Sequence, residues 1–216
     1  MAGPLGDAAG GSGALLTDEP LEPELHESRL AYEGRVWDVR EERFAYGGGE
    51  LTRHYVDHPG AVAVLALDEA DRVLLIQQYR HPVRRREWEL PAGLLDAPDE
   101  SPLAAARREL AEEVDLAAEE WALLADFVTS PGGSNEAVRI YLARGLRSTG
   151  RAFERSGEEA DIVPRWVPLE EAVEAVRASR LGNAIAVVGV LSAEVERARD
   201  WRGLRDAETP WTRSSR

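Results

Sequence analysis

Two nearly continuous apolar runs lie close together near the middle of the chain. They read GAVAVLAL at residues 60–67 and VLLIQQYR at residues 73–80, and a short polar segment, DEADR, joins them. Strands that are buried on both faces have such unbroken runs, because neither face alternates with water. The pair therefore predicts two central strands of a sheet that is covered on both sides.

A strand-rich region precedes these runs. RVWDVREERFAY and ELTRHYVDH flank three glycines at residues 47–49, and glycine supplies the positive φ that a tight hairpin turn needs. We expect this strand region to span residues 27–58. Residues 1–26 are rich in Gly, Ala, Pro and acids and lack the basic and apolar regions of a signal peptide, so we expect a disordered lead there.

Strands and helices alternate irregularly through residues 59–200. Ser101 and Pro102 supply the N-cap and the first turn of a helix that carries an apolar stripe. Further strands are predicted at residues 88–95, 121–130, 136–146 and 162–169, and further helices at 168–179 and 183–200. This order indicates the α/β class, with a mixed central sheet and helices on both faces. A flexible polar tail is expected over residues 201–216.

The composition excludes several classes of function. The chain has 26 Lys+Arg against 40 Asp+Glu, a net charge of −14, which disfavours a general nucleic-acid or anionic-membrane surface. Cysteine is absent, so disulfides, thiolate metal sites and cysteine nucleophiles are excluded. No apolar run reaches the length of a membrane span. We expect a cytoplasmic protein with neither nucleic-acid nor membrane partners.

The helix after Pro102 gathers acids at its end. Glu109, Glu112, Glu113 and Asp115 lie within seven residues, and carboxylates three or four residues apart on a helix repel each other. Such hard oxygen ligands suit Mg²⁺ or Mn²⁺, whereas the lack of cysteine and the scarcity of histidine argue against zinc. From the helix alone, a solvated acidic face is the alternative interpretation.

The residues around these acids favour the metal site. Gly93, Glu100 and the run RELAEE at residues 108–113 resemble the signature of the Nudix hydrolases, G-x5-E-x7-REUxEE-x-GU, in which U is aliphatic. Two positions depart from that pattern. Six residues instead of five separate Gly93 from Glu100, and Asp115 replaces a glycine that normally ends the helix in the left-handed conformation. Aspartate visits that conformation at modest cost.

The resemblance implies an α/β/α sandwich and a role for each residue of the signature. The implied metal ligands are Glu109, Glu113, the backbone carbonyl of Ala92 and Glu112, which could instead position water. Arg108 and Glu100 would form an ion pair behind the ligands and hold the helix against the preceding loop. The alternative for Arg108 is a simple pair with Glu112, one helical turn away.

Segments outside the signature resemble the ADP-ribose pyrophosphatase branch of the family. They are QQYRH at residues 77–81, WELPAG at 88–93, and Pro131, which lies sixteen residues after position 115 (131 − 115 = 16). The resemblance implies hydrolysis of ADP-ribose to AMP and ribose 5-phosphate with Mg²⁺ or Mn²⁺. It also implies a homodimer built through the N-terminal strands.

The resemblance also suggests which residues bind the substrate and which supplies the general base. Arginine suits phosphate because of its planar fork of donors, so Arg80 and Arg53 are candidates, with Arg53 reaching the site of the partner subunit, and Glu89 of WELPAG joins them. The base is implied to come from a loop that ERSGEEADIV, residues 154–163, matches best. Glu159 is the first candidate and Glu158 the second, and Glu136 is an outside candidate.

Two other functions stay open from the sequence. The first is hydrolysis of another nucleoside diphosphate derivative, such as GDP-mannose, another nucleotide sugar or NADH. The second is a non-catalytic module that senses nucleotides. An intact RELAEE run argues against the second, because a protein without catalysis need not keep the metal ligands.

Overall fold

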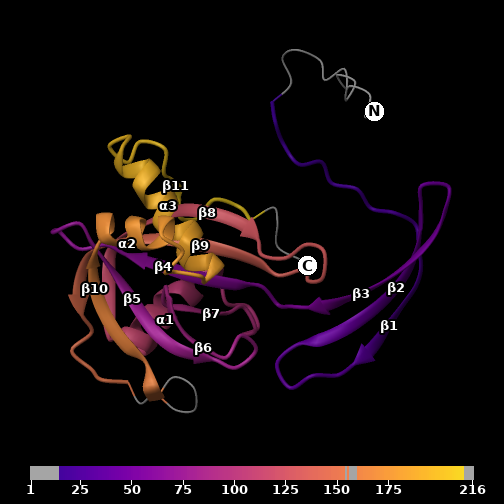
Figure 1. The fold of residues 1–216 in the computed structure, drawn as a ribbon, viewed down its shortest axis with the longest axis horizontal. Helices are drawn as coiled ribbons and strands as arrows, with labels where there is room; N and C mark the ends of the chain where they lie inside the picture. The colour runs from indigo at the N-terminus through magenta and orange to yellow at the C-terminus, as the bar shows by residue number, and fades with distance from the viewer. Residues whose placement is uncertain (1–14, 154, 156–159, 212–216) are drawn as a thin grey trace.

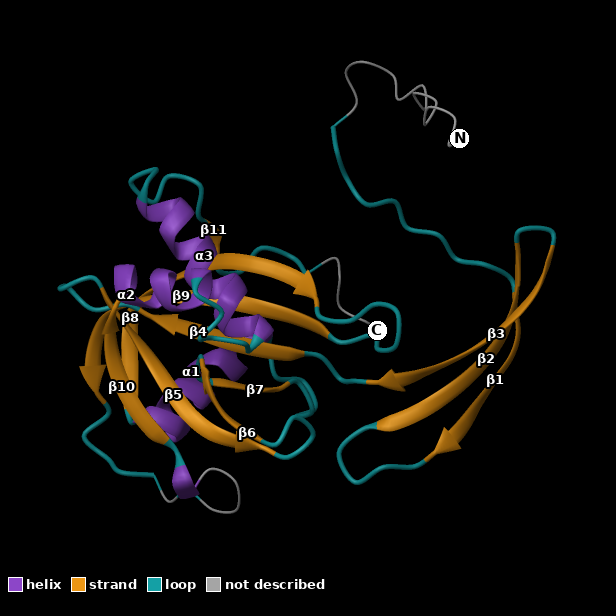
Figure 2. Ribbon diagram, in the orientation of Figure 1, coloured by secondary structure: helices purple, strands orange, loops and turns teal. Residues whose placement is uncertain are grey.

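The structure is a computed structural model that describes residues 15–153, 155 and 160–211 of the chain. A three-stranded sheet stands apart from an α/β domain (Figures 1 and 2). The strands are β1 (Leu25–Tyr32), β2 (Asp38–Tyr46), β3 (Gly49–Asp57), β4 (Ala61–Ala66), β5 (Arg72–Arg80), β6 (Arg85–Glu89), β7 (Ala92–Leu94), β8 (Leu116–Val128), β9 (Ala137–Ser148), β10 (Val163–Pro168) and β11 (Arg205–Asp206). The helices are α1 (Pro102–Val114), α2 (Leu169–Arg177) and α3 (Ala184–Arg197).

The domain contains a mixed five-stranded sheet, in the order β11-β8-β9-β4-β7, and a three-stranded sheet, β10-β5-β6. β4 runs parallel to β9 and antiparallel to β7. Alternate residues of β4 enter two separate cores: Leu65 packs in the core with α2 and α3, and Val64 packs in the core with α1. Every residue of β4 is buried, which explains its unbroken apolar run. The predicted α/β/α sandwich with a mixed sheet is confirmed.

Helix α1 begins as the sequence predicts and ends at Asp115, the position where the signature has glycine. The Ser101 hydroxyl accepts a hydrogen bond from the backbone N–H of Ala104 at 3.2 Å, and Pro102 is the first helical residue. Leu110 is fully buried on the apolar stripe. Asp115 has φ 56° and ψ 32°, the left-handed conformation expected at this position, and its N–H bonds the Ala111 carbonyl. The aspartate that replaces the usual glycine therefore still ends the helix.

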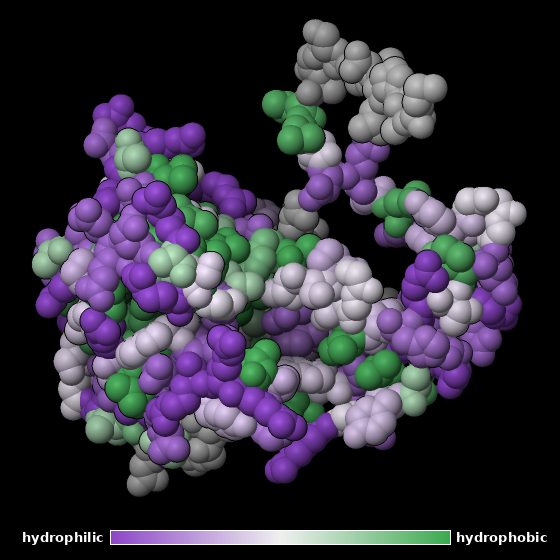
Figure 3. All heavy atoms as spheres, viewed as in Figure 1, coloured by the Kyte–Doolittle hydropathy of each residue, from purple (hydrophilic) through white to green (hydrophobic). Residues whose placement is uncertain are grey.

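The N-terminal sheet has the order β1-β2-β3, and the expected hairpin turns at Gly47 and Gly48, which have φ values of 61° and 79°. Large apolar residues are exposed on this sheet and its connections: Leu25, Leu30, Tyr32, Val36 and Trp37. Figure 3 shows separate hydrophobic patches in green on this part of the molecule. β3 joins the domain through backbone hydrogen bonds between Val56 and the loop at Gly133 and Asn135. The sheet therefore projects from the domain with apolar surface in water.

Residues 201–211 are packed, although the sequence suggested a flexible tail over residues 201–216, of which 212–216 lie outside the described residues. β11 pairs with β8, and Arg139 of β9, which is 2% exposed, donates to the Thr209 carbonyl at 2.7 Å. The same guanidinium lies 5.0 Å from the ring centre of Trp211. A buried arginine needs such partners, so residues 201–211 pack on the domain. Of the described helices, none is long and apolar enough to cross a membrane.

Candidate functional site

Two acids of α1 point into the protein. Glu109 and Glu113 are only 8% and 4% exposed, and because they are four residues apart they leave the same face of the helix. That face lies against β7, where the backbone N–H of Ala92 donates to Oε2 of Glu113 at 2.9 Å. A solvated acidic face, the alternative that the helix alone allowed, is therefore wrong for these two side chains.

The glycine of the signature is explained by its contact with Glu109. A Cβ added to Gly93 would lie 2.0 Å from Oε1 and 2.1 Å from Cδ of Glu109, closer than real Cβ atoms approach other atoms. Any larger residue at position 93 would push the carboxylate away from β7. Glycine is needed here for the close approach of a side chain to the backbone.

Arg108 sits among the acids and binds three of them. Its Nε and Nη2 donate to Glu100 at 3.0 and 2.9 Å, and its Nη1 donates to Glu109 at 2.6 Å and to Glu112 at 3.1 Å. These contacts, with that to Glu100 the strongest, raise the pKa of Arg108, so it stays charged at all ordinary pH. Arg108 thus makes the contact with Glu100 and the contact with Glu112 at once, so it does not pair with Glu112 alone.

Arg80 and Glu89 form a second pair, on neighbouring strands β5 and β6. Nε and Nη2 of Arg80 donate to the two carboxylate oxygens of Glu89 at 2.8 and 2.7 Å, and Glu89 is 3% exposed. Leu74 of β5 packs in the core beneath α1, so strand alternation places Arg80 on that side of its sheet. Trp88 packs against the core of α2 and α3 instead. The pair thus faces the same layer as the acidic helix.

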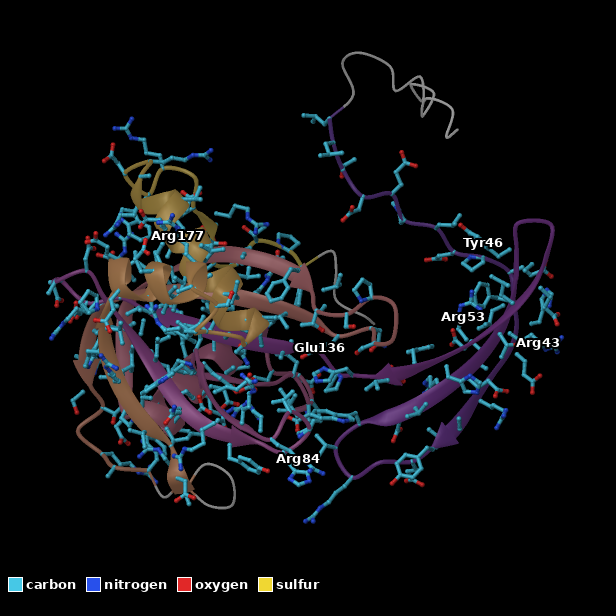
Figure 4. All side chains as sticks on the ribbon, viewed as in Figure 1. Arg43, Tyr46, Arg53, Arg84, Glu136 and Arg177 are labelled. Carbon is cyan, nitrogen blue, oxygen red and sulfur yellow. The ribbon has the colours of Figure 1, made fainter. Side chains whose placement is uncertain are left out.

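A third cluster joins the N-terminal sheet to the domain. Glu136, labelled in Figure 4, accepts a hydrogen bond from the Thr129 hydroxyl at 2.6 Å, and its Oε1 lies 3.6 Å from Nε2 of His58. The Gly60 N–H donates to Nδ1 of His58, so the neutral ring carries its proton on Nε2 and turns it toward Glu136. Burial lowers the pKa of His58, although Glu136 raises it. No pattern in the sequence predicted that His58 and Glu136 would meet.

One candidate residue is not brought to α1, and two others lie outside the described residues. Arg53 lies exposed on β3 and donates to the Thr52 carbonyl, and Figure 4 shows it on the projecting sheet, away from the domain. Within one chain the structure therefore does not join Arg53 to the acids. Glu158 and Glu159, the leading candidates for the general base, lie outside the described residues.

The fold and this site agree with the comparison with protein families. The model of the NUDIX domain matches residues 57–187, more than half of the chain. The chain therefore belongs to the Nudix family. The matched range begins at the end of β3 and ends within α3, so it contains α1, β5, β6 and β7.

The proteins that are similar to this chain include two ADP-ribose pyrophosphatases and a solved structure of a hydrolase. The ADP-ribose pyrophosphatase of Mycobacterium tuberculosis (strain ATCC 25618 / H37Rv) is 46% identical over 166 residues, 76% of this chain and 80% of the relative. The ADP-ribose pyrophosphatase of Bacillus subtilis (strain 168) is 31% identical over 179 residues, 82% and 96% of the two chains. A crystal structure of an ADP compounds hydrolase superposes with a TM-score of 0.70 at 20% identity, covering 86% of this chain and all of that one, and shows the shared fold.

The donors on α1 fit the divalent cations that Nudix hydrolases generally use. Glu109 and Glu113 offer buried carboxylate oxygens next to the backbone of β7, which is the hard, anionic environment that such ions prefer. Within the described part of the chain, no three Asp, Glu or His side chains already converge as a complete set of ligands. The Arg108 guanidinium donates to both Glu109 and Glu112 in this structure.

Proposed function

We propose that this protein hydrolyses the diphosphate bond of ADP-ribose to AMP and ribose 5-phosphate, using Mg²⁺ or Mn²⁺. The observation that carries the proposal is the pair of buried carboxylates, Glu109 and Glu113, packed against Ala92 and Gly93 of β7. The 46% identity to a protein named ADP-ribose pyrophosphatase supports the choice of substrate.

Each residue of the signature has a role in this proposal. Glu109, Glu113 and the carbonyl of Ala92 hold the cation, and Glu112, which is 42% exposed, holds it as well or orients water. When bound, the ion neutralises the diphosphate and lowers the pKa of a water molecule. Glu100 fixes Arg108, and Arg108 in turn orients two of the acids through their carboxylates.

The remaining roles concern the substrate and the base. We assign Arg80 and Glu89 to substrate binding, because their pairing fixes the guanidinium on the same side of the sheet as α1. Glu159 is the proposed general base, which takes a proton from the attacking water, with Glu158 second. Glu136 is the weaker candidate, because its carboxylate is held by Thr129 and faces His58.

A homodimer through the N-terminal sheet completes the proposal. The sheet β1-β2-β3 exposes Leu30, 46%, and Tyr32, 67%, and an uncovered sheet edge with apolar side chains is a surface for pairing with a second chain. A partner on this sheet would also give Arg53 a site to act in, since its own chain places it away from α1.

The test is a direct assay of the purified protein. Each reaction would contain the protein, Mg²⁺ and one substrate: ADP-ribose, GDP-mannose, a further nucleotide sugar or NADH. The products would be separated by chromatography. AMP and ribose 5-phosphate formed fastest from ADP-ribose would support the proposal. A higher kcat/KM for GDP-mannose or NADH would reassign the substrate, and binding of nucleotides without any turnover would indicate a sensing module.

A further inference from the structure

Asp115 does more than end helix α1. Its Oδ1 accepts a hydrogen bond from the backbone N–H of Phe153 at 2.9 Å, and its Oδ2 accepts one from Nη2 of Arg155 at 2.7 Å. The backbone carbonyl of Asp115 accepts a third, from the N–H of Thr149 at 3.0 Å. The segment that follows β9 is thus fastened to the end of α1 at three points, two of which depend on the carboxylate.

Arg155 also binds the helix itself. Its Nε donates to the backbone carbonyl of Glu112 at 3.0 Å, while its Nη2 donates to the carboxylate of Asp115. Carbonyls in the last turn of a helix lack partners within the helix, so Arg155 satisfies one of them. The guanidinium is also only about a quarter exposed, with a side-chain value of 26%. One arginine therefore bridges the last turn of α1 and the residue that ends it.

This bridge acts where the helix is electrostatically unfavourable. The C-terminal end of a helix carries about half a negative charge, which disfavours nearby carboxylates, yet Glu112 and Glu113 both lie in the last turn of α1. The last turn contains no basic residue of its own. Arg155 brings a positive charge to this end from outside the helix, and Arg108 brings one to Glu112 from within the helix.

We propose that Asp115 and Arg155 are positioning residues for the hydrolysis: together they hold the last turn of α1, and so the carboxylates of Glu112 and Glu113, in place for the cation and water. This inference rests on the proposed function. Asp115 occupies a position where the Nudix signature has glycine, and the left-handed backbone there strains any residue with a Cβ. The contacts of the carboxylate offset that strain.

The substitution Asp115→Gly separates positioning from simple stability. Glycine adopts φ 56° without strain, so the variant loses two side-chain contacts but relieves the backbone, and we expect little change in Tm. Asp115→Asn keeps an oxygen that accepts from the Phe153 N–H and loses the charge. Arg155→Gln removes the bridge from the other side without touching the backbone of Asp115.

We expect Asp115→Gly and Arg155→Gln each to lower kcat, or to raise the Mg²⁺ concentration for half-maximal rate, by about 10-fold, the usual effect of losing a group that orients metal ligands. Asp115→Asn should recover part of the loss. The double variant should lose no more than the worse single variant, because both remove one bridge. Wild-type kcat and Mg²⁺ requirement in Asp115→Gly, or losses that simply add, would overturn the proposal.

A matched control is Arg177→Gln. Arg177 is also an arginine in the last turn of a helix, α2, where it binds Glu174 at 2.6 Å, but α2 packs on the other core of the domain (Figure 4). Its activity and Mg²⁺ requirement should equal those of the wild type. If Asp115→Gly fails to fold, Asp115→Asn and Arg155→Gln carry the same test, and normal kcat and Mg²⁺ requirement in both would overturn the proposal.

Two measurements without turnover distinguish this inference from the proposed function. Calorimetry should show that Asp115→Gly binds Mn²⁺ about 10-fold more weakly than the wild type does. Hydrogen exchange should show faster exchange of the Phe153 amide in Asp115→Gly but not in Arg177→Gln. If the wild type hydrolyses no diphosphate, but Asp115→Gly still shows weaker Mn²⁺ binding and faster exchange, only the proposed function would be contradicted. Unchanged Mn²⁺ affinity together with unchanged exchange would contradict the bridge.

Discussion

Glu100 and Arg108 are joined by two parallel hydrogen bonds, of 3.0 and 2.9 Å, between the loop before α1 and the helix. The pairing fixes the guanidinium plane, and the remaining nitrogen, Nη1, donates hydrogen bonds to Glu109 and Glu112. One arginine thus sets the position of two acids and offsets their repulsion. This arrangement explains how α1 tolerates so many carboxylates on a short run.

Arg108→Gln should disturb both the helix and the site. The variant keeps a polar side chain but loses the fork, so we expect a fall in activity or in metal affinity of about 10- to 100-fold. Tm should also fall, because Glu109 and Glu112 then repel without compensation. Arg108→Lys should not restore activity, since an ammonium cannot bind Glu100 with two parallel bonds. Full activity of the lysine variant would mean that only the charge matters.

Glu113→Gln tests the metal site directly. We expect most of the activity to be lost, because an amide is a poor ligand for Mg²⁺ compared with a carboxylate. The metal-free variant should be no less stable, since the amide oxygen can still accept from the Ala92 N–H and one repulsive charge is gone. Activity and thermal unfolding, with and without EDTA, check both points. Full turnover by the variant, or by the wild type in excess EDTA, would refute the metal assignment.

The sequence was most informative where short-range patterns and burial agree. The run in β4 predicted a strand buried on both faces, and the two cores on either side of it show why. Ser101 and Pro102 predicted the start of α1, because capping depends on a few neighbouring residues. The spacing of Glu109 and Glu113 likewise predicted a shared face.

Contacts between distant segments could not be predicted in this way. Arg139 binds the Thr209 carbonyl seventy residues away, so residues 201–211 of the expected tail are packed on the domain. The bridge from Asp115 to Arg155 spans forty residues and also has no local signal. No periodicity in a single sequence records such pairings, because they depend on how strands and loops meet in space.

The buried His58 should make stability depend on pH. Burial lowers its folded pKa below the ordinary value of 6.5, so below about pH 6.5 the unfolded chain binds a proton that the folded protein resists. Stability should therefore fall as pH drops from 6.5 toward the lower folded pKa. Tm measured between about pH 7.5 and 5 should fall less in His58→Gln than in the wild type. His54 is exposed, so His54→Gln is the control variant. A Tm profile of His58→Gln that is identical to that of the wild type would contradict the prediction.

Arg53 should act in the active site of the partner subunit. We expect Arg53→Ala to raise KM for ADP-ribose, because an arginine that binds phosphate would be lost. Light scattering should first show a dimer. If Arg53→Ala and Glu113→Gln chains are mixed and allowed to exchange, the hybrid dimer has one site with both Glu113 and Arg53 intact only if Arg53 acts across the dimer. Recovery of activity on mixing would confirm this, and a lack of recovery, or a monomer, would rule it out.

The general base should be found by comparing three glutamates. If Glu159 takes the proton, Glu159→Gln should lower kcat by about 10²–10⁴-fold, the usual contribution of a positioned base. KM should change little, because the arginines and the cation carry the binding. A third metal ligand at this position would instead raise the Mg²⁺ requirement, and excess metal would restore part of the rate. An inactive Glu158→Gln or Glu136→Gln with a normal Glu159→Gln would move the base to that residue, and normal rates in all three would move it to Glu112 on α1.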